Sequence, residues 1–163
     1  MTILSRLYAS GGTEVLIPTL ELTCSAWDGA ERICHGFTDV TALDEHGVSK
    51  TYRAGGIEIA LPKVDTTGTQ VLTFAVDNVS GRAQQLVDLS TDAQQKILLT
   101  FRQYISTDLS APADNPLHFV VRDVAMEGTI VQLFAEFFDM INTSWPRNHY
   151  TADFAPGIKY FVR

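Results

Sequence analysis

Short segments in which apolar and polar residues alternate, separated by turn signals, most constrain how this chain can fold. In residues 20–25 (LELTCS) every second residue is apolar, which is the period of a strand with one buried face. Residues 70–77 (QVLTFAVD) repeat the pattern, with Leu72, Phe74 and Val76 on one face. A chain built from many such segments is expected to form antiparallel sheets.

Turn signals divide the chain at hairpin spacing. Asp28-Gly29, residues 44–47 (DEHG) and Glu127-Gly128 each supply a glycine for a turn. Strands are predicted at residues 20–25, 31–38, 39–43, 48–52, 57–61, 70–77, 96–104, 117–126 and 129–140. The chain is therefore predicted to be mainly β, an antiparallel sandwich or barrel of roughly eight to ten strands.

Two helices are predicted beside these strands. An N-terminal helix is expected over about residues 3–9, ended by a glycine pair. A short internal helix is expected over about residues 81–89, where the apolar residues share a helical face. For residues 131–140 a helix competes with a strand. The phenylalanine content and the preceding turn favour a strand that is apolar on both faces, and so central or at a subunit contact.

Composition bounds the classes of function. The 163 residues suffice for one domain with a core, and 45% hydrophobic content excludes a disordered chain. A net charge of −7 with scattered basic residues disfavours nucleic acid as a partner. No signal peptide and no membrane span are expected, because no apolar run is long enough. Residues 1–141 are predicted to form a single β-rich domain.

The cysteines and histidines are candidates for a metal or catalytic site. Cys24, Cys34, His35 and His46 lack the close pairs that zinc sites use. His35 follows Cys34 on a strand and faces away from it, so it is badly placed to activate the thiol. The sequence leaves open whether Cys24 and Cys34 pair, because pairing depends on the length of the loop between them. We expect no metal and no cofactor.

Other candidate groups are weaker. Asp77, Asp123 and Glu127 could bind calcium or act as acid and base, but solvated strand ends are the commoner case. His149 could form a polar site near the end of the chain, against an ordinary hydrogen-bonded terminus. The common catalytic motifs of phosphate-binding, dinucleotide-binding, zinc-protease and serine-hydrolase sites are absent, so we expect no enzyme.

The last segment, residues 142–163, holds two prolines, five aromatic residues and almost no apolar periodicity. A residue before proline is kept out of the helical region, so an extended strap is predicted. Its aromatic side chains need something to pack on, either the chain's own domain or a neighbouring subunit. The predicted interface residues are Trp145, Tyr150, Phe154, Tyr160 and Phe161. The alternative use of these aromatics is a platform for a sugar or another ligand.

Four segments in a fixed order resemble a known family. They are LELTCSAWDGAERICHGFTDVTAL, TYRAGGIEIALP, LTFAVDNVSGRAQQLV, and the ending that runs from FAEFFDMIN through WPRNHYTADF to FAPGI. Together they resemble phage minor tail proteins related to the amino-terminal part of lambda-type minor tail protein L. The resemblance covers about residues 4–158.

This resemblance implies a structural virion component of the tail tip or baseplate hub, made in the host cytoplasm. It also implies a β-rich, tube-like fold and a homo-oligomer, a trimer around the tail axis, that contacts other tail proteins. Lambda-type protein L continues into a domain with an iron–sulfur cluster. Two widely spaced cysteines cannot supply its four thiolates, so the cluster is not carried over. The alternative function is a ligand- or carbohydrate-binding β-barrel.

Overall fold

A computed structural model describes residues 14–60, 71–77 and 81–137, and within them the chain is mainly β. The strands are β1 Leu16–Thr23, β2 Glu31–His35, β3 Val40–Leu43, β4 Ser49–Gly55, β5 Ile57–Ala60, β6 Val71–Asp77, β7 Leu98–Ile105, β8 Leu117–Glu127 and β9 Ile130–Glu136. Helix α2, Arg82–Asp92, lies between β6 and β7 in the sequence. The predicted N-terminal helix and the strap of residues 142–163 lie outside the described residues.

The strands form one sheet in the order β3-β4-β2-β1-β7-β8-β9-β6-β5. Neighbours run antiparallel, except that β2 and β4 are parallel. The β-rich class and the internal helix are thus confirmed. The predicted barrel closure is wrong, since β3 and β5 are the two edges of an open sheet. At Gly55-Gly56 the chain leaves β4, which lies next to the edge strand β3, and enters β5, which is the other edge strand. At that edge β5 pairs with β6.

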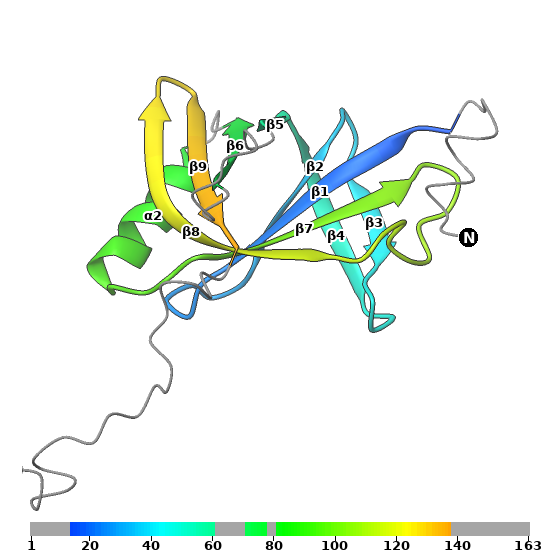
Figure 1. The fold of residues 1–163 in the computed structure, drawn as a ribbon, viewed down its shortest axis with the longest axis horizontal. Coiled ribbons are helices and arrows are strands. Elements are labelled where there is room, and N and C mark those ends of the chain that lie inside the picture. Colours follow the sequence, from blue (N-terminus) through cyan, green and yellow to red (C-terminus); the bar gives the residue numbers. More distant parts are fainter. Residues whose placement is uncertain (1–13, 61–70, 78–80, 138–163) are drawn as a thin grey trace, which may run out of the picture.

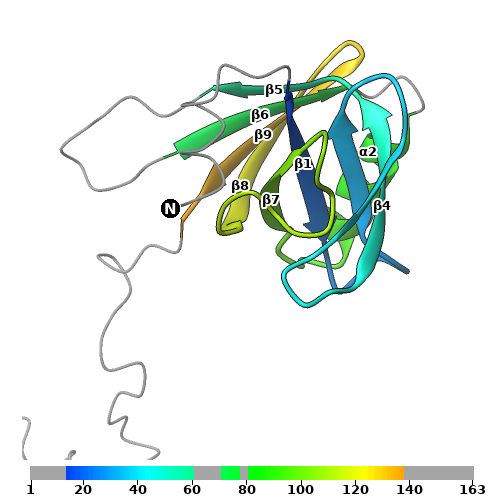
Figure 2. The same ribbon diagram turned by 90° about the vertical axis from the view of Figure 1, so that its right-hand side faces the viewer.

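The sheet is strongly twisted, and β1 and β7 run diagonally through its middle (Figure 1). The group β8-β9-β6-β5 lies to one side of them and the group β2-β4-β3 to the other, as the turned view also shows (Figure 2). Helix α2 is fixed to the loop between β1 and β2, where the Trp27 indole Nε1 donates to the Leu86 carbonyl at 2.8 Å. No helix among the described ranges is long and apolar enough to cross a membrane.

The two faces of the β1–β7 pair carry different chemistry. Leu20 lies opposite Phe101 and Leu22 opposite Leu99, and these side chains belong to the larger core. Alternate residues of the same strands point to the other face, where Thr19 lies opposite Arg102. The other buried members of the larger core come from β5, β6, β8, β9 and the loop after α2: Ile57, Leu72, Phe74, Val76, Ile97, Phe119, Val131, Leu133 and Ala135. Ala83 and Val87 of α2 pack against it.

The other face of β1–β7 carries a smaller core beneath the β3–β4 hairpin. Cys34, Ala42, Tyr52 and Tyr104 are its buried members, and the two tyrosine rings lie 6.0 Å apart between centroids. The Tyr104 hydroxyl donates to the Leu43 carbonyl at 3.0 Å, so it joins β7 to the end of β3. This hairpin is therefore folded onto the central pair by both apolar and polar contacts.

Strand β9 resolves the ambiguity between helix and strand for residues 131–140 as far as residue 136. It lies between β8 and β6, with Val131, Leu133 and Ala135 buried. The prediction of a central strand is thus confirmed, but only one face of β9 is buried, since Ile130 on the other face is 45% exposed. The turns that precede β4 and β9 are confirmed as well, because Gly47 and Gly128 have φ of +75° and +62°, a region that favours glycine.

Phe74→Ala tests the larger core. The ring is fully buried and lies 5.8 Å from the ring of Phe119 and 6.1 Å from that of Phe101 between centroids. Removing it leaves a cavity, and we expect the free energy of unfolding to fall by about 3–5 kcal/mol. Val48→Ala is the control: that side chain is 54% exposed, so its loss should change stability by no more than about 0.5 kcal/mol. Urea unfolding measures both, and equal losses would contradict this core.

Candidate functional site

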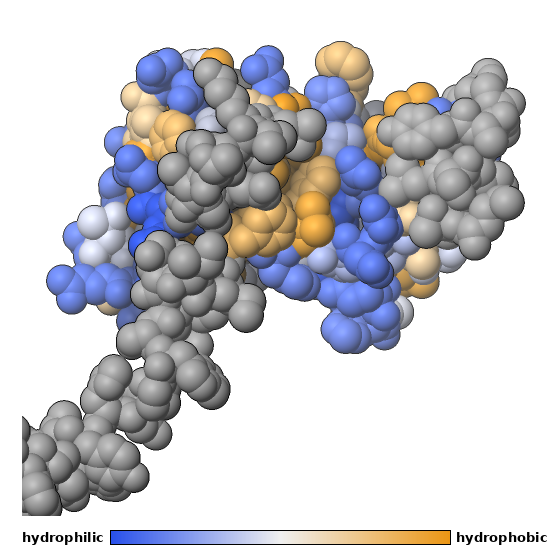
Figure 3. Space-filling view, viewed as in Figure 1, coloured by the Kyte–Doolittle hydropathy of each residue, from blue (hydrophilic) through white to orange (hydrophobic). Residues whose placement is uncertain are grey.

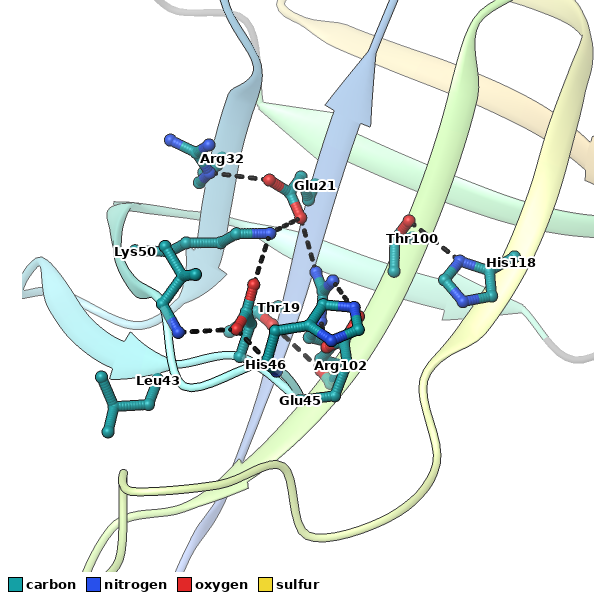
Figure 4. Close-up of polar contacts among 12 residues, drawn as sticks. Thr19, Glu21, Arg32, Leu43, Glu45, His46, Lys50, Thr100, Arg102 and His118 are labelled. Atoms are coloured by element: carbon teal, nitrogen blue, oxygen red, sulfur yellow. Dashed lines mark hydrogen bonds and ion pairs between the residues drawn. The ribbon is translucent and has the colours of Figure 1, made fainter.

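The most concentrated set of charged side chains lies between the β1–β7 pair and the β3–β4 hairpin. We call it the Glu21 cluster, and its six members are Glu21, Asp44 and Glu45 with Arg32, Lys50 and Arg102. In Figure 4 the labelled members converge from β1, β2, the turn after β3, β4 and β7; they are Glu21, Arg32, Glu45, Lys50 and Arg102. Three acids meet three bases, so the formal charge of the cluster is zero.

Glu21 is the centre of the cluster, and its side chain is only 6% exposed. Its Oε2 accepts from Arg102 Nη1 at 2.6 Å and from Lys50 Nζ at 2.8 Å. Its Oε1 accepts from Arg32 Nε at 2.9 Å. A buried carboxylate is tolerated only when charged partners satisfy it in this way, and breaking one such bond leaves a buried charge.

Arg102 and Asp44 extend the cluster into the turn between β3 and β4. Arg102 donates from Nε and Nη2 to the two carboxylate oxygens of Glu45, at 2.8 and 3.0 Å. Asp44 Oδ1 accepts from the backbone N–H groups of His46 and Val48 at 2.9 and 2.8 Å. Its Oδ2 lies 3.2 Å from Lys50 Nζ. The turn is therefore fixed from within by Asp44 and to β7 by the bidentate pair.

These contacts hold the acids ionised. The Val48 amide, with a further contribution from the His46 amide and Lys50, lowers the pKa of Asp44 to about 2. The Arg102 guanidinium lowers the pKa of Glu45 to about 2. Burial alone would raise the pKa of Glu21, but hydrogen bonds from Lys50, Arg102 and Arg32 outweigh it and the net pKa is lowered. Carboxylates fixed in this way suit the joining of strands better than the transfer of protons.

A second set of ion pairs ties α2 to the sheet. Glu31 Oε2 accepts from Arg82 Nε at 2.7 Å, and Glu31 Oε1 lies 3.7 Å from Arg53 Nη1. Arg82 is the first residue of α2 and Glu31 the first of β2. Both arginines are about half exposed, so these pairs contribute less than those of the Glu21 cluster.

Several large apolar side chains point to the surface instead of into either core. Phe37, in the loop between β2 and β3, is 104% exposed, which is the full exposure of an unpacked residue. The others are Val15, Val48, Leu89, Leu98, Leu117, Met126, Ile130 and Phe137. In Figure 3 apolar surface gathers in the middle of the face shown, between hydrophilic regions on either side. Single exposed apolar residues are ordinary, but a fully exposed phenylalanine has no packing role in the described domain.

An open groove of about 610 Å³ runs between α2 with its following loop and strand β8. Its apolar lining includes Val87, Ile97, Val121 and Phe137, and its polar lining includes Lys96. The Phe137 ring packs 4.5 Å from that of Phe119 between centroids, at the edge of the larger core. The groove is thus an extension of the core to the surface, and it can accept an apolar side chain.

The candidate site of two cysteines and two histidines does not form, because these four residues are not brought together. Cys34 is buried, with its pKa raised by burial, and its single S–H has two acceptors within reach, the carbonyl oxygens of Thr38 and Tyr52 at 3.7 and 3.6 Å from Sγ. Cys24 follows the end of β1, whereas Cys34 lies opposite Thr19 near the start of that strand. Both thiols are free. His35 and His46 are exposed at separate ends of the β3–β4 hairpin region.

The three carboxylate residues considered for calcium binding or acid–base chemistry also lie at separate places in the sheet. Asp123 lies on β8 at an irregularity in its pairing with β9, while Glu127 ends β8 beside the turn. Asp77 ends β6. Across residues 14–60, 71–77 and 81–137 no three His, Cys, Asp or Glu side chains are grouped to hold a metal ion. His149 and the five strap aromatics fall outside those ranges.

Sequence reasoning did not find the Glu21 cluster. A signal for it was present, since Glu21 and Arg102 each interrupt an apolar strand with a charge. A charge of each sign on two strands of one sheet can be satisfied if the strands are neighbours, as β1 and β7 are. The order of the strands was needed to recognise the pair.

A family model described as a domain of unknown function (DUF1833) matches residues 2–150, which is most of the chain. No curated protein matches the chain.

The lowered pKa values predict how stability depends on pH. Asp44 and Glu45 have a pKa of about 2 in the folded protein and ordinary values when unfolded. Their contribution is therefore complete above the unfolded pKa and is lost as the pH falls through the folded pKa, between about pH 5 and pH 2. We expect urea unfolding to show a steep loss of stability in that window.

The variant Glu45→Gln tests how much of the acid loss of stability comes from the Glu45 carboxylate. Because it removes one of the depressed carboxyls, it should reduce stability at neutral pH and flatten the dependence in the acid window. Asp88→Asn, which removes an exposed carboxylate of α2 outside the cluster, should keep the wild-type slope. An unchanged slope in Glu45→Gln would contradict the assignment.

Proposed function

We propose that this chain, which belongs to the DUF1833 family of proteins with a domain of unknown function, is a structural component of a phage or prophage tail tip. In this proposal it assembles with copies of itself, as a trimer around the tail axis, and with other tail proteins. Its location is then the virion, after synthesis in the host cytoplasm. Its role requires no catalytic group and no cofactor.

The ordered segments that resemble minor tail proteins support the proposal. The first, residues 20–43, includes most of the β1–β2 hairpin and β3. The second, residues 51–62, runs from β4 through the glycine turn into β5, and the third, residues 72–87, joins β6 to α2. These segments therefore belong to the framework of the sheet. They also lie within the residues that the family model matches.

The observation that carries the proposal is the contrast between buried charge and exposed apolar surface. The charges of the Glu21 cluster neutralise one another inside the domain, whereas Phe37 and other large apolar side chains face outward. Exposed apolar side chains of this kind are buried when a protein assembles. An assembly protein needs such a surface on a rigid domain.

The groove beside α2 favours the alternative function, a ligand-binding protein. Its volume of about 610 Å³ is within the range of small-molecule sites. Against this alternative, the sheet is open and encloses no barrel interior. The groove is also lined by valines and long polar side chains, with Phe137 as its aromatic residue in the described part of the chain. A sugar platform would require more aromatic faces.

The mass of the protein in solution tests the proposal and the role of the strap. Light scattering would be measured on the full chain, on a chain ending at Ile141, and on full-length Trp145→Ala with Phe154→Ala. We expect a trimer for the full chain and a monomer with unchanged circular dichroism for the other two. The double variant keeps the full chain length, so it separates the loss of the aromatic side chains from the effect of removing the segment.

Three other outcomes of the light-scattering experiment would change the proposal. A monomer in all three cases, with the fold intact, would contradict self-assembly through the strap. Binding of a sugar or small ligand by that monomer, with protection of the groove, would favour the alternative function. Unfolding of the truncated chain alone would show that the strap completes its own domain.

A further inference from the structure

We propose that Phe37 of one copy inserts into the groove beside α2 of the next copy, so that copies associate head to tail. The inference rests on the proposed function, because it names the surfaces through which copies would meet. Its two parts are the loop of residues 36–39, which carries Phe37, and the groove lined by Val87, Ile97, Val121 and Phe137.

The loop is fixed in place although the Phe37 side chain is fully exposed. The Gly36 amide donates to the Gly55 carbonyl at 3.3 Å, and the Ala54 amide donates to Asp39 Oδ1 at 2.9 Å. The buried Cys34 thiol donates to the Thr38 carbonyl at 3.7 Å. These bonds hold both ends of the loop against β2 and β4. An exposed ring on a fixed loop loses little conformational freedom on binding, which is a property of interface anchor residues.

The groove offers a matching receptor. Ile97 is 6% exposed and joins the larger core, and Val87 and Val121 pack against that core. The apolar part of the lining is therefore continuous with the larger core, beside polar side chains such as Gln94 and Asp123, and the volume of about 610 Å³ leaves room for an aromatic side chain. Inserting Phe37 would remove apolar surface from water on both partners.

Charge supports a second copy as the occupant. Asp39 lies two residues from Phe37 and is exposed, and Lys96 lines the groove and is also exposed. Neither takes part in an ion pair with another of the described residues. A carboxylate beside the inserted ring and an ammonium beside the groove favour this orientation of two copies.

The loop and the groove lie on different parts of the molecule. The β2–β3 loop is at the top of Figure 1, and α2 with the adjoining part of β8 is at the left. A contact between two different surfaces is heterologous, and it leaves a free loop and a free groove at the two ends of any open chain of copies. Repetition therefore gives a ring or a filament instead of a closed pair, which suits a protein arranged around an axis.

A mixing experiment between two variants tests the inference. Phe37→Ala removes the inserted side chain and keeps the groove, while Thr91→Trp fills the groove from α2 and keeps Phe37. The strap and this contact are both needed for a stable trimer, so each variant alone should lose association although it keeps the strap, with affinity reduced by roughly thirtyfold or more, as for an interface anchor. Mixed together, the two retain one loop and one groove, so they should form a complex with one copy of each.

The readouts are light scattering and amide chemical shifts of ¹⁵N-labelled Phe37→Ala at increasing concentrations of unlabelled Thr91→Trp. We expect shifts in residues 87–97 and 120–124, which border the groove. Val48→Ala, another exposed apolar residue, and Asp88→Trp, on α2 away from the groove lining, are the matched controls. Both should associate like the wild-type chain.

Two results would overturn the inference. One is the absence of groove shifts in the mixture at concentrations up to about 1 mM, the weakest contact of interest. The other is wild-type association of Phe37→Ala, whether or not Thr91→Trp associates, because the groove would then take another occupant. Neither result decides whether the protein belongs to a virion, so failure of this inference is distinguishable from failure of the proposed function.

Discussion

The ion pair between Glu21 and Arg102 is the interaction on which the rest of the structure depends. It lies on the polar face of the β1–β7 pair, whose other face supports the larger core. Through Lys50 and Glu45 the same pair holds the β3–β4 hairpin. One carboxylate thus links β1, β2, β4 and β7. Because both of its oxygens are satisfied, the burial of these charges fixes the arrangement of strands without leaving an unpaired charge.

Much of the fold was predictable from local pattern, and its limits have physical causes. Alternation located the strands, and the glycines at 47 and 128 located two turns. Alternation cannot show which strands are neighbours, so it missed the parallel pair of β2 and β4 and the open edges. The Glu21 cluster was missed for the same reason, since its members come from residues 21 to 102. The exposure of Phe37 likewise depends on the loop and not on its sequence pattern.

The proposal of a role in assembly rests on the distribution of polar and apolar groups. Charged side chains that pair inside the domain give it rigidity, and a fixed loop places an aromatic ring outside it. Rigid elements with exposed anchors lower the entropic cost of association. The groove beside α2 is continuous with the larger core, so a partner that enters it would extend that core across the contact. Together these features favour a structural role.

The most direct test of the proposed role is to look for the protein in phage particles produced from the genome that carries its coding sequence. The coding sequence would be inactivated, with and without a complementing copy, and the particles compared by electron microscopy and protein mass spectrometry. The account predicts that the protein is present in intact virions, and that its loss gives incomplete tail tips and no infection until the copy is restored. Normal, infectious tails that lack the protein would contradict the account.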